Sequence, residues 1–257
     1  MCGRYAITTA PEAIRKLFGY GEQPNFPPRY NIAPTQPIPI VRLEHGARRF
    51  ALVRWGLIPS WVDDPKKFSL VINARVDSVL EKPAFRNAMR YRRCLIPADG
   101  FYEWRAVGAG PKQPYYIHAG DGAPFAFAGL WESWSGPNGE EMETAAIVTT
   151  DANATLKPIH DRMPVILTPE AFEAWLDTRN VDAETAAQLL TPAADEMLEA
   201  CPISTAVNRV ANDDANLIAR VTEAEAEATA EARAAETKPE RPASKRKKND
   251  DRQPSLF

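Results

Sequence analysis

Long apolar segments are absent from this chain of 257 residues. No run approaches the ~20 apolar residues that a membrane-spanning helix needs, and the first residues lack the basic-then-apolar pattern of a signal peptide. Cysteine and histidine are also scarce, with 3 residues of each. Cys2, Cys94 and Cys201 have neither the spacing of metal ligands nor the density of a disulfide framework. These absences favour a protein of the reducing cytoplasm.

Charge is spread unevenly along the sequence. Residues 1–118 hold 18 Lys and Arg against 9 Asp and Glu, whereas residues 119–221 hold 5 against 17. The net charge of −3 therefore combines a basic first part with an acidic second part. A local basic surface is what phosphate binding needs, whatever the overall charge. A solvated charged surface explains the same counts without any ligand.

Hydrophobic periodicity predicts a mixed fold for residues 1–221. We expect a short helix after Thr9 and further helices at 78–90, 169–176 and 182–190. A hairpin is expected around His45-Gly46. The expected strands are 38–43, 49–55, 94–97, 114–118, 125–130, 144–150 and 164–167. Because these strands cluster instead of alternating strictly with helices, we expect an α+β fold with a largely antiparallel, barrel-like β core flanked by helices.

The end of the chain has a different composition. Residues 222–252 are rich in Ala and Glu and then in Lys, Arg and Pro, with almost nothing apolar to bury. This composition predicts a charged tether, helical at first and then disordered. The last five residues, QPSLF at 253–257, resemble the Gln-x-x-Leu-Phe peptide with which bacterial replication and repair proteins bind the sliding clamp. That resemblance predicts a clamp-binding peptide made by Gln253, Leu256 and Phe257.

The N-terminal sequence MCGRY places a cysteine directly after the initiator methionine. Removal of Met1 would give Cys2 a free α-amine, with a pKa near ~8, beside a thiol with a pKa near ~8.5. An aldehyde can form an imine with such an amine, and the thiol can then close a five-membered thiazolidine ring. Ring closure is intramolecular and therefore strongly favoured. The alternative is that Cys2 is an ordinary small residue after the start codon.

Polar side chains capable of supporting this chemistry occur in the interior of the sequence. Asn73 follows the apolar stretch at 69–72, and Glu103 lies among three aromatic residues, which would raise its carboxyl pKa and suit it to proton transfer. His160 lies between two prolines, next to Asp161 and Arg162. Taken one at a time, these residues are equally explained as a turn former, an ion-pair partner and a satisfied loop residue.

A set of short motifs runs in order through residues 1–221. They are MCGRYA at the start, RYNIAPTQ at 29–36, RWGLIPSW at 54–61, INAR at 72–75, RRCLIPADGFYEW at 92–104, IVTTDAN at 147–153 and IHDRMPVIL at 159–167. Together they resemble the SRAP family, the SOS-response-associated peptidases, whose members crosslink to abasic sites in DNA. The resemblance implies a SRAP catalytic domain over residues 1–221.

The resemblance also implies a mechanism. Cys2, exposed by loss of Met1, would attack the ring-opened aldehyde of an abasic site in single-stranded DNA and form a stable thiazolidine crosslink that protects the lesion during replication. Asn73 would hydrogen-bond near the amine, Glu103 would move protons, and His160 would contact the opened sugar. No metal or organic cofactor is needed. The implied DNA contacts are Arg4, Arg29, Asn31, Pro34, Trp61, Arg75, Trp104, Thr149 and Arg162.

Three other functions compete with this interpretation. Cys2 and His160 could form a thiol peptidase, including one that removes its own Met1. An MCG start also occurs in class II glutamine amidotransferases, where Cys2 attacks an amide, but here Arg4 and Tyr5 replace the usual apolar run and no glutamine-site motif follows. The basic half and the aromatic residues could instead bind single-stranded DNA without a covalent step. We expect a monomer in the cytoplasm, associated with the nucleoid and replication fork.

Overall fold

The computed structural model describes residues 2–108, 110–222 and 225. Its strands are β1 Tyr5–Ile7, β2 Arg29–Ile32, β3 Pro37–Glu44, β4 Ala47–Trp55, β5 Asn73–Arg75, β6 Arg93–Ala98, β7 Gly100–Arg105, β8 Gln113–Ala119, β9 Phe125–Ser135, β10 Glu141–Asp151, β11 Arg162–Pro164, β12 Ile166–Leu167 and β13 Leu198–Pro202. Its α-helices are α1 Pro11–Phe18, α2 Arg86–Tyr91, α3 Phe172–Leu176 and α4 Ala183–Ala187. Short 3-10 turns occur at Val76–Ser78, Pro169–Ala171, Asp195–Met197, Thr205–Asn208 and Ala215–Ile218.

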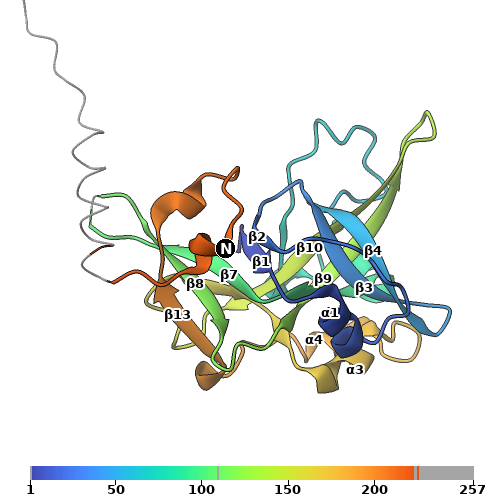
Figure 1. Cartoon of the computed structure of the whole chain (residues 1–257). Coiled ribbons are helices and arrows are strands. Elements are labelled where there is room, and N and C mark those ends of the chain that lie inside the picture. The colour runs from blue at the N-terminus through green and yellow to red at the C-terminus, as the bar shows by residue number, and fades with distance from the viewer. Residues whose placement is uncertain (1, 109, 223–224, 226–257) are drawn as a thin grey trace, which may run out of the picture.

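The central sheet closes into a barrel. Strand β4 pairs with β3, β3 with β6, β6 with β9 and β9 with β10, and β10 returns to pair with β4. Most of these pairs are antiparallel, while β10 runs parallel to β4 and to the short β5. Figure 1 shows the helices α1, α3 and α4 below this barrel. The structure therefore confirms the α+β fold with a largely antiparallel barrel core.

A second sheet, in the order β13-β8-β7-β1-β2, carries the N-terminal strand. Strand β1 lies between β7 and β2 and is antiparallel to both. Along β7, Phe101 contacts Phe127 of the barrel, while Tyr102 faces the other way and donates to the carbonyl of Tyr30. Because side chains alternate along a strand, Glu103 lies on the same face as Phe101, toward the barrel.

Aromatic packing fixes the start of the chain against the barrel. The ring of Tyr5 meets Trp55 edge-on at 5.5 Å and Phe127 at 5.8 Å, and all three side chains are buried. Trp55 also donates its indole N–H to the carbonyl of Ile72 at 3.0 Å. One buried tryptophan therefore anchors both the strand that follows Cys2 and the segment that leads into Asn73.

The local sequence explains most of the element boundaries. The hairpin turn at His45 and Gly46 has φ values of 49° and 80°, as expected for the tight two-residue turns that join antiparallel strands. The predicted helix at 169–176 is confirmed as a 3-10 turn that leads into α3, and the one at 182–190 is shorter, as α4. The helix expected over 78–90 is wrong in its first half. Pro83 cannot donate a helical hydrogen bond and restricts the residue before it, so only α2 forms.

The predicted tether at 222–252 and the clamp-binding peptide at 253–257 lie outside the described residues, apart from Thr222 and Glu225. The described fold reaches Val221, whose amide donates to the carbonyl of Pro202. None of the helices in the described part of the chain is long and apolar enough to cross a membrane.

Asp99 connects β1 to the start of α1. Its carboxylate accepts hydrogen bonds from the amide of Thr8 and from the amide and hydroxyl of Thr9, and its own amide donates to Ala6. We expect Asp99→Ala to lower the free energy of unfolding by about 2 kcal/mol, because it leaves the half-buried donors of Thr8 and Thr9 without a charged acceptor.

Urea unfolding followed by tryptophan fluorescence measures this loss. Asp99→Asn, which keeps one carbonyl acceptor, should lose less. An unfolding free energy within error of the wild-type value for Asp99→Ala would contradict this role.

Candidate functional site

Cys2 lies at the edge of the core, directly before β1. Its side chain is fully buried, its thiol donates to the carbonyl of Arg4 at 3.7 Å, and its carbonyl accepts from the side-chain amide of Asn73 at 3.0 Å. Burial, reinforced by the negative charge of Glu103, raises the pKa of the Cys2 thiol far above its ordinary value. The thiol is therefore protonated at neutral pH, and a reaction at sulfur needs a nearby group to take its proton.

Asn73 begins β5, the short strand beside β10. While its side-chain N–H holds the main chain of Cys2, its Oδ1 is buried and has no hydrogen-bond partner among the described residues. On the neighbouring strand β10, the hydroxyl of Thr149 is also buried and also has no hydrogen-bond partner among the described residues. Buried polar atoms without partners cost about 1–3 kcal/mol each, so these two atoms mark a place where a polar ligand can bind.

Glu103 supplies a carboxyl group from β7. It is 2% exposed, and burial raises its pKa above the ordinary value, an effect that the nearby His160 partly opposes. The Nε2 of His160 lies 4.0 Å from the Glu103 Oε2. A carboxyl group whose pKa is moved toward neutrality can both accept and donate a proton at physiological pH.

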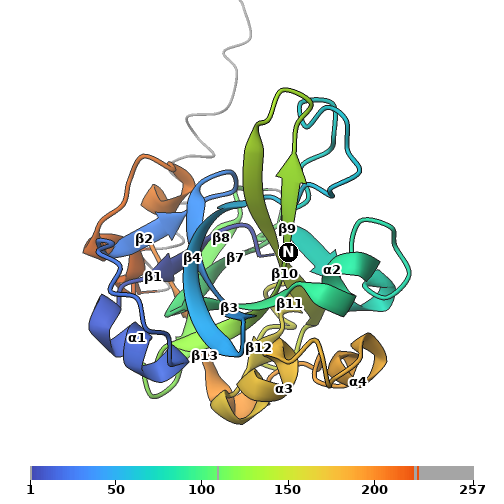
Figure 2. The same ribbon diagram turned by 90° about the vertical axis from the view of Figure 1, so that its right-hand side faces the viewer.

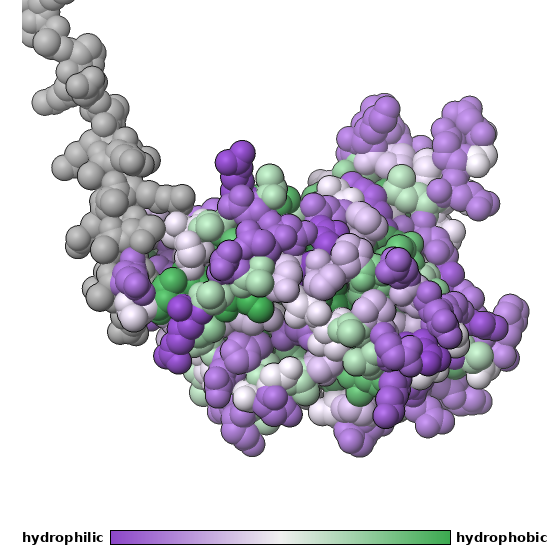
Figure 3. Space-filling model, in the orientation of Figure 1, coloured by the Kyte–Doolittle hydropathy of each residue, from purple (hydrophilic) through white to green (hydrophobic). Residues whose placement is uncertain are grey.

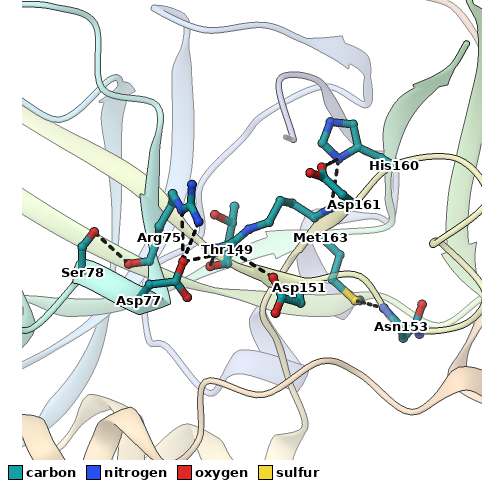
Figure 4. Close-up of polar contacts among 10 residues, drawn as sticks. Arg75, Asp77, Ser78, Thr149, Asp151, Asn153, His160, Asp161 and Met163 are labelled. Atoms are coloured by element: carbon teal, nitrogen blue, oxygen red, sulfur yellow. Dashed lines mark hydrogen bonds and ion pairs between the residues drawn. The ribbon is translucent and has the colours of Figure 1, made fainter.

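The imidazole of His160 is oriented by the turn that precedes β11. The backbone amide of Arg162 donates to the Nδ1 of His160 at 3.0 Å. The backbone amide of His160 donates to the carbonyl of Leu156. The bond to Nδ1 assigns the proton of a neutral imidazole to Nε2, the atom that faces Glu103. Asp161 also lies within 2.9 Å of Nδ1 (Figure 4), but its carboxylate is exposed and pairs with that atom only when the ring is doubly protonated.

Cys2, Asn73, Glu103 and His160, the predicted catalytic residues, therefore lie around one position. They come from the segment before β1, from β5, from β7 and from the turn before β11, which are far apart in the sequence. The chemistry of this set is that of a protonated thiol, a carboxyl group ready for proton transfer, and donors for a polar substrate.

Arg75 and Arg162, both predicted DNA contacts, share Asp77. Figure 4 shows Arg75 and Asp77 side by side. Arg75 is exposed and pairs with Asp77 at 2.6 Å, while Arg162 is buried and bonds Asp77 at 3.2 Å and Asp151 at 3.0 Å. The guanidinium of Arg75 holds the pKa of the Asp77 carboxyl below its ordinary value. Arg75 is accordingly the more accessible of the two cations. Sequence reasoning missed Asp77, although its position two residues after Arg75 was a signal.

Three more of the predicted DNA-contact residues form a second cluster beside β1. Arg4 donates to the Oδ1 of Asn31 at 2.8 Å, and Asn31, fully buried, donates to the carbonyls of Val207 and Asn212. Asn31 thus positions Arg4 and the 207–212 loop from inside the fold. Arg29 lies at the rim and pairs with Asp213 at 2.6 Å.

The predicted DNA contacts with aromatic or apolar side chains, Trp61, Pro34 and Trp104, are at least partly exposed. Trp61 is 56% exposed, and Pro34 is half-buried at the turn between β2 and β3. The indole of Trp104 donates to the side chain of Asn208 at 2.8 Å. The Val207-Asn208 region also resembles the SRAP family, but no local pattern connects it with β7, so the contact with Trp104 could not be predicted from the sequence.

Comparison with known proteins places these residues in a family. The family model for SOS response associated peptidase (SRAP) matches residues 1–210. The chain belongs to the SRAP family. The motifs singled out from the sequence therefore identified the family correctly.

Relatives extend over most of the chain. The abasic site processing protein YoaM of Bacillus subtilis is 39% identical, over 85% of this chain and 97% of its own length. The abasic site processing protein HMCES of Xenopus tropicalis is 33% identical, over 86% of this chain and 78% of its own. A solved structure from Bacteroides thetaiotaomicron superposes with a TM-score of 0.77 at 31% identity, covering 86% of this chain and all of that one.

The buried carboxyl of Glu103 predicts a pH-dependent stability. Since its folded pKa is raised, its contribution to stability is complete below its unfolded pKa and is lost as the pH rises through the folded pKa. Glu103→Gln removes this titration, so the variant should gain stability relative to wild type as the pH rises from about 4 to about 8.

Thermal unfolding of both proteins across this pH range measures the difference, with the exposed Glu81→Gln as the matched control. A difference between Glu103→Gln and wild type that stays constant with pH would show that burial does not perturb this carboxyl.

Proposed function

We propose that this protein processes abasic sites in single-stranded DNA by forming a thiazolidine crosslink through Cys2 after Met1 has been removed. The observation that carries the proposal is the convergence of Asn73, Glu103 and His160 on Cys2, with the unpartnered Asn73 Oδ1 and Thr149 hydroxyl beside them. Relatives named as abasic site processing proteins, similar over most of this chain, support the same substrate.

The first stage joins the Cys2 amine to the lesion. The α-nitrogen attacks the aldehyde carbon of the ring-opened sugar, a C–N bond forms, and the carbonyl oxygen takes a proton to become a hydroxyl. Loss of that hydroxyl as water gives a protonated imine, and its departure needs an acid. Glu103 is the acid, because burial raises its pKa and so favours its protonated form.

The second stage closes the ring. The sulfur adds to the imine carbon, an S–C bond forms, and the electron pair of the C=N bond moves to nitrogen. The thiol must lose its proton in this step, and Glu103, ionised when it gave its proton to the departing water, accepts it. The ring nitrogen keeps the proton that the protonated imine already carries, so Glu103 ends as it began. One water is released overall and nothing is oxidised or reduced.

Asn73 and His160 orient the reactants. The Asn73 side-chain N–H holds the main chain of Cys2 at 3.0 Å, which leaves its Oδ1 to accept from the amine or from a sugar hydroxyl. The Nε2–H of His160 faces the same position and donates to the hydroxyl that ring opening creates on the sugar. Thr149 supplies a further hydroxyl there.

The DNA strand follows the cations and aromatic groups around this position. Arg75 can exchange Asp77 for a phosphate because both are exposed, while the buried Arg162 acts through the same network. Arg4 and Arg29 supply positive charge beside β1. Trp61 and Pro34 offer apolar faces that cover bases at a kink in the strand.

The thiol environment argues against the peptidase and amidotransferase alternatives. Both reactions begin with attack by a thiolate, and enzymes of this type lower the pKa of their cysteine. Burial and Glu103 act in the opposite direction on Cys2. A reaction that begins at the amine and uses the sulfur second fits a protonated thiol.

Incubation with a single-stranded oligonucleotide that carries one abasic site tests the proposal. We expect an adduct that survives boiling on a denaturing gel with wild type and with Cys201→Ala, a control that removes a cysteine outside the site. Cys2→Ala, and protein that retains Met1, should form none, because each lacks part of the thiol–amine pair. An unchanged adduct with Cys2→Ala would contradict the proposal.

We also propose that residues 253–257 recruit the protein to the bacterial sliding clamp. Support comes from the sequence QPSLF and from a tether of about 31 residues, whose typical reach as a flexible coil is ~30 Å. Deletion of 253–257 should abolish binding to purified clamp in a titration. A scrambled version of the same five residues is the control, and it should also fail to bind. Equal binding by the full chain and the deletion would contradict the proposal.

A further inference from the structure

A pocket of about 660 Å³ opens between the β9–β10 hairpin and the chain at 56–70. Figure 1 and Figure 2 show these two segments projecting side by side from the barrel, and in Figure 3 their hydrophilic tips form two separate knobs. The residues that define its chemistry are Thr35, Arg54, Lys66, Phe68, Leu70 and Trp134. The steps of the proposed mechanism use none of them.

The pocket is continuous with the proposed DNA path. The ring of Phe68 meets the ring of Trp61 edge-on at 5.9 Å. Leu70 lies three residues before Asn73, and Val71 between them is bridged to Leu57 on the pocket wall. Thr35, on another wall, directly follows Pro34. A strand that contacts Trp61 and Pro34 therefore passes the mouth of this pocket.

The walls suit a flat, uncharged ring. Phe68 and Trp134 are aromatic. Leu70 is 51% exposed, although the residues around it form an apolar cluster. A ligand that covers Leu70 therefore removes apolar surface from water. Arg54 and Lys66 place positive charge at the same pocket. This combination of aromatic and apolar walls with nearby cations is the one used to bind unstacked bases and their phosphates.

Three carboxylates also line the pocket, those of Asp63, Asp64 and Glu140, and two of them are engaged within their own loops. Asp64 accepts from the amide of Lys66 and pairs with Lys67 at 3.4 Å, while Glu140 accepts from the amide and side chain of Asn138. Their charge is partly neutralised within the loops that carry them. The pocket volume lies in the range of small-molecule sites, about 300–1,000 Å³, and accommodates one nucleoside.

We propose that this pocket receives one intact nucleobase of the bound strand, close to the abasic position. The inference rests on the proposed function and extends it, because it gives the protein a contact with a neighbour of the lesion as well as with the lesion itself. A base that is unstacked where Trp61 covers the kink enters between Phe68 and Leu70. Recognition of the substrate then requires a missing base at one position and a present base at another.

The test uses single-stranded oligonucleotides in which the lesion is tetrahydrofuran, an abasic analogue without an aldehyde, so that no crosslink forms. A second tetrahydrofuran replaces, in turn, each of the nucleotides that flank it on either side. Affinity is measured by fluorescence anisotropy. For wild type, we expect the loss of one particular flanking base to weaken binding by about fivefold or more, since each stacked base contributes substantially.

Variants of the pocket show whether that base is held there. In Leu70→Ala and Phe68→Ala the loss of the same base should cost less than about twofold, because the contact has already been removed. Leu43→Ala, which truncates an exposed leucine on β3 away from the pocket, should keep the wild-type penalty. Leu70 is more than half exposed, so Leu70→Ala leaves the fold intact. The test therefore holds even if Phe68→Ala disturbs the neighbouring ring of Trp61.

The proposal is overturned if no flanking base matters for wild type, or if the penalty is the same in Leu70→Ala and Leu43→Ala. The affinity measurements and the crosslinking assay can fail independently of each other. A base-dependent affinity without a Cys2 adduct would contradict the crosslinking proposal alone. A Cys2 adduct with natural abasic DNA, but no base-dependent affinity, would contradict the pocket proposal alone.

Discussion

Burial of a thiol and a carboxyl group beside each other is the constraint on which the rest of this site depends. The apolar surroundings raise the pKa of Cys2 and of Glu103 together, and the charge of Glu103 adds to the effect on the thiol. A protonated thiol is a poor nucleophile by itself. In the proposed reaction the amine of the same residue reacts first, and the carboxyl removes the thiol proton afterwards. The same burial that suppresses thiolate chemistry thus suits ring closure.

The fold supplies this burial by fixing a chain terminus inside a core, where termini are usually loose. Tyr5 packs against Trp55 and Phe127, and Asp99 fastens the end of β1 to the start of α1. Trp55 also holds the carbonyl before Asn73, so Asn73 and Cys2 are positioned by one side chain. Outside this apolar cluster, Arg75, Asp77 and Arg162 form a charged network in which Arg75 and Asp77 are exposed.

Sequence reasoning predicted the class of the fold because its signals are local. The turn at His45-Gly46 and the long alternating strands β3, β4, β9 and β10 follow from short-range patterns. It also selected the four central residues, but through the SRAP motifs and not through periodicity. What it missed depends on contacts between distant segments: the buried position of Asn31, the contact between Trp104 and Asn208, and the pocket between two loops. The first half of the helix expected at 78–90 was wrong because Pro83 outweighs the apolar pattern around it, and only α2 forms.

The basic first half of the sequence acquires a structural meaning once the sheets are assembled. Arg4, Arg29 and Arg75 come from strands, or from residues next to strands, that lie around Cys2. Acidic partners such as Asp77 and Asp213 hold the exposed arginines in place. This arrangement of preoriented cations suits the proposed attachment to a damaged strand.

Intact mass spectrometry of the adduct, before and after treatment with borohydride, tests the central claim most directly. A closed thiazolidine has no C=N bond, so the adduct should have the summed mass of protein without Met1 and DNA, less one water, and should be unchanged by the reductant. A mass that increases by two hydrogens on treatment would show an open imine, and would contradict the role assigned to the Cys2 sulfur.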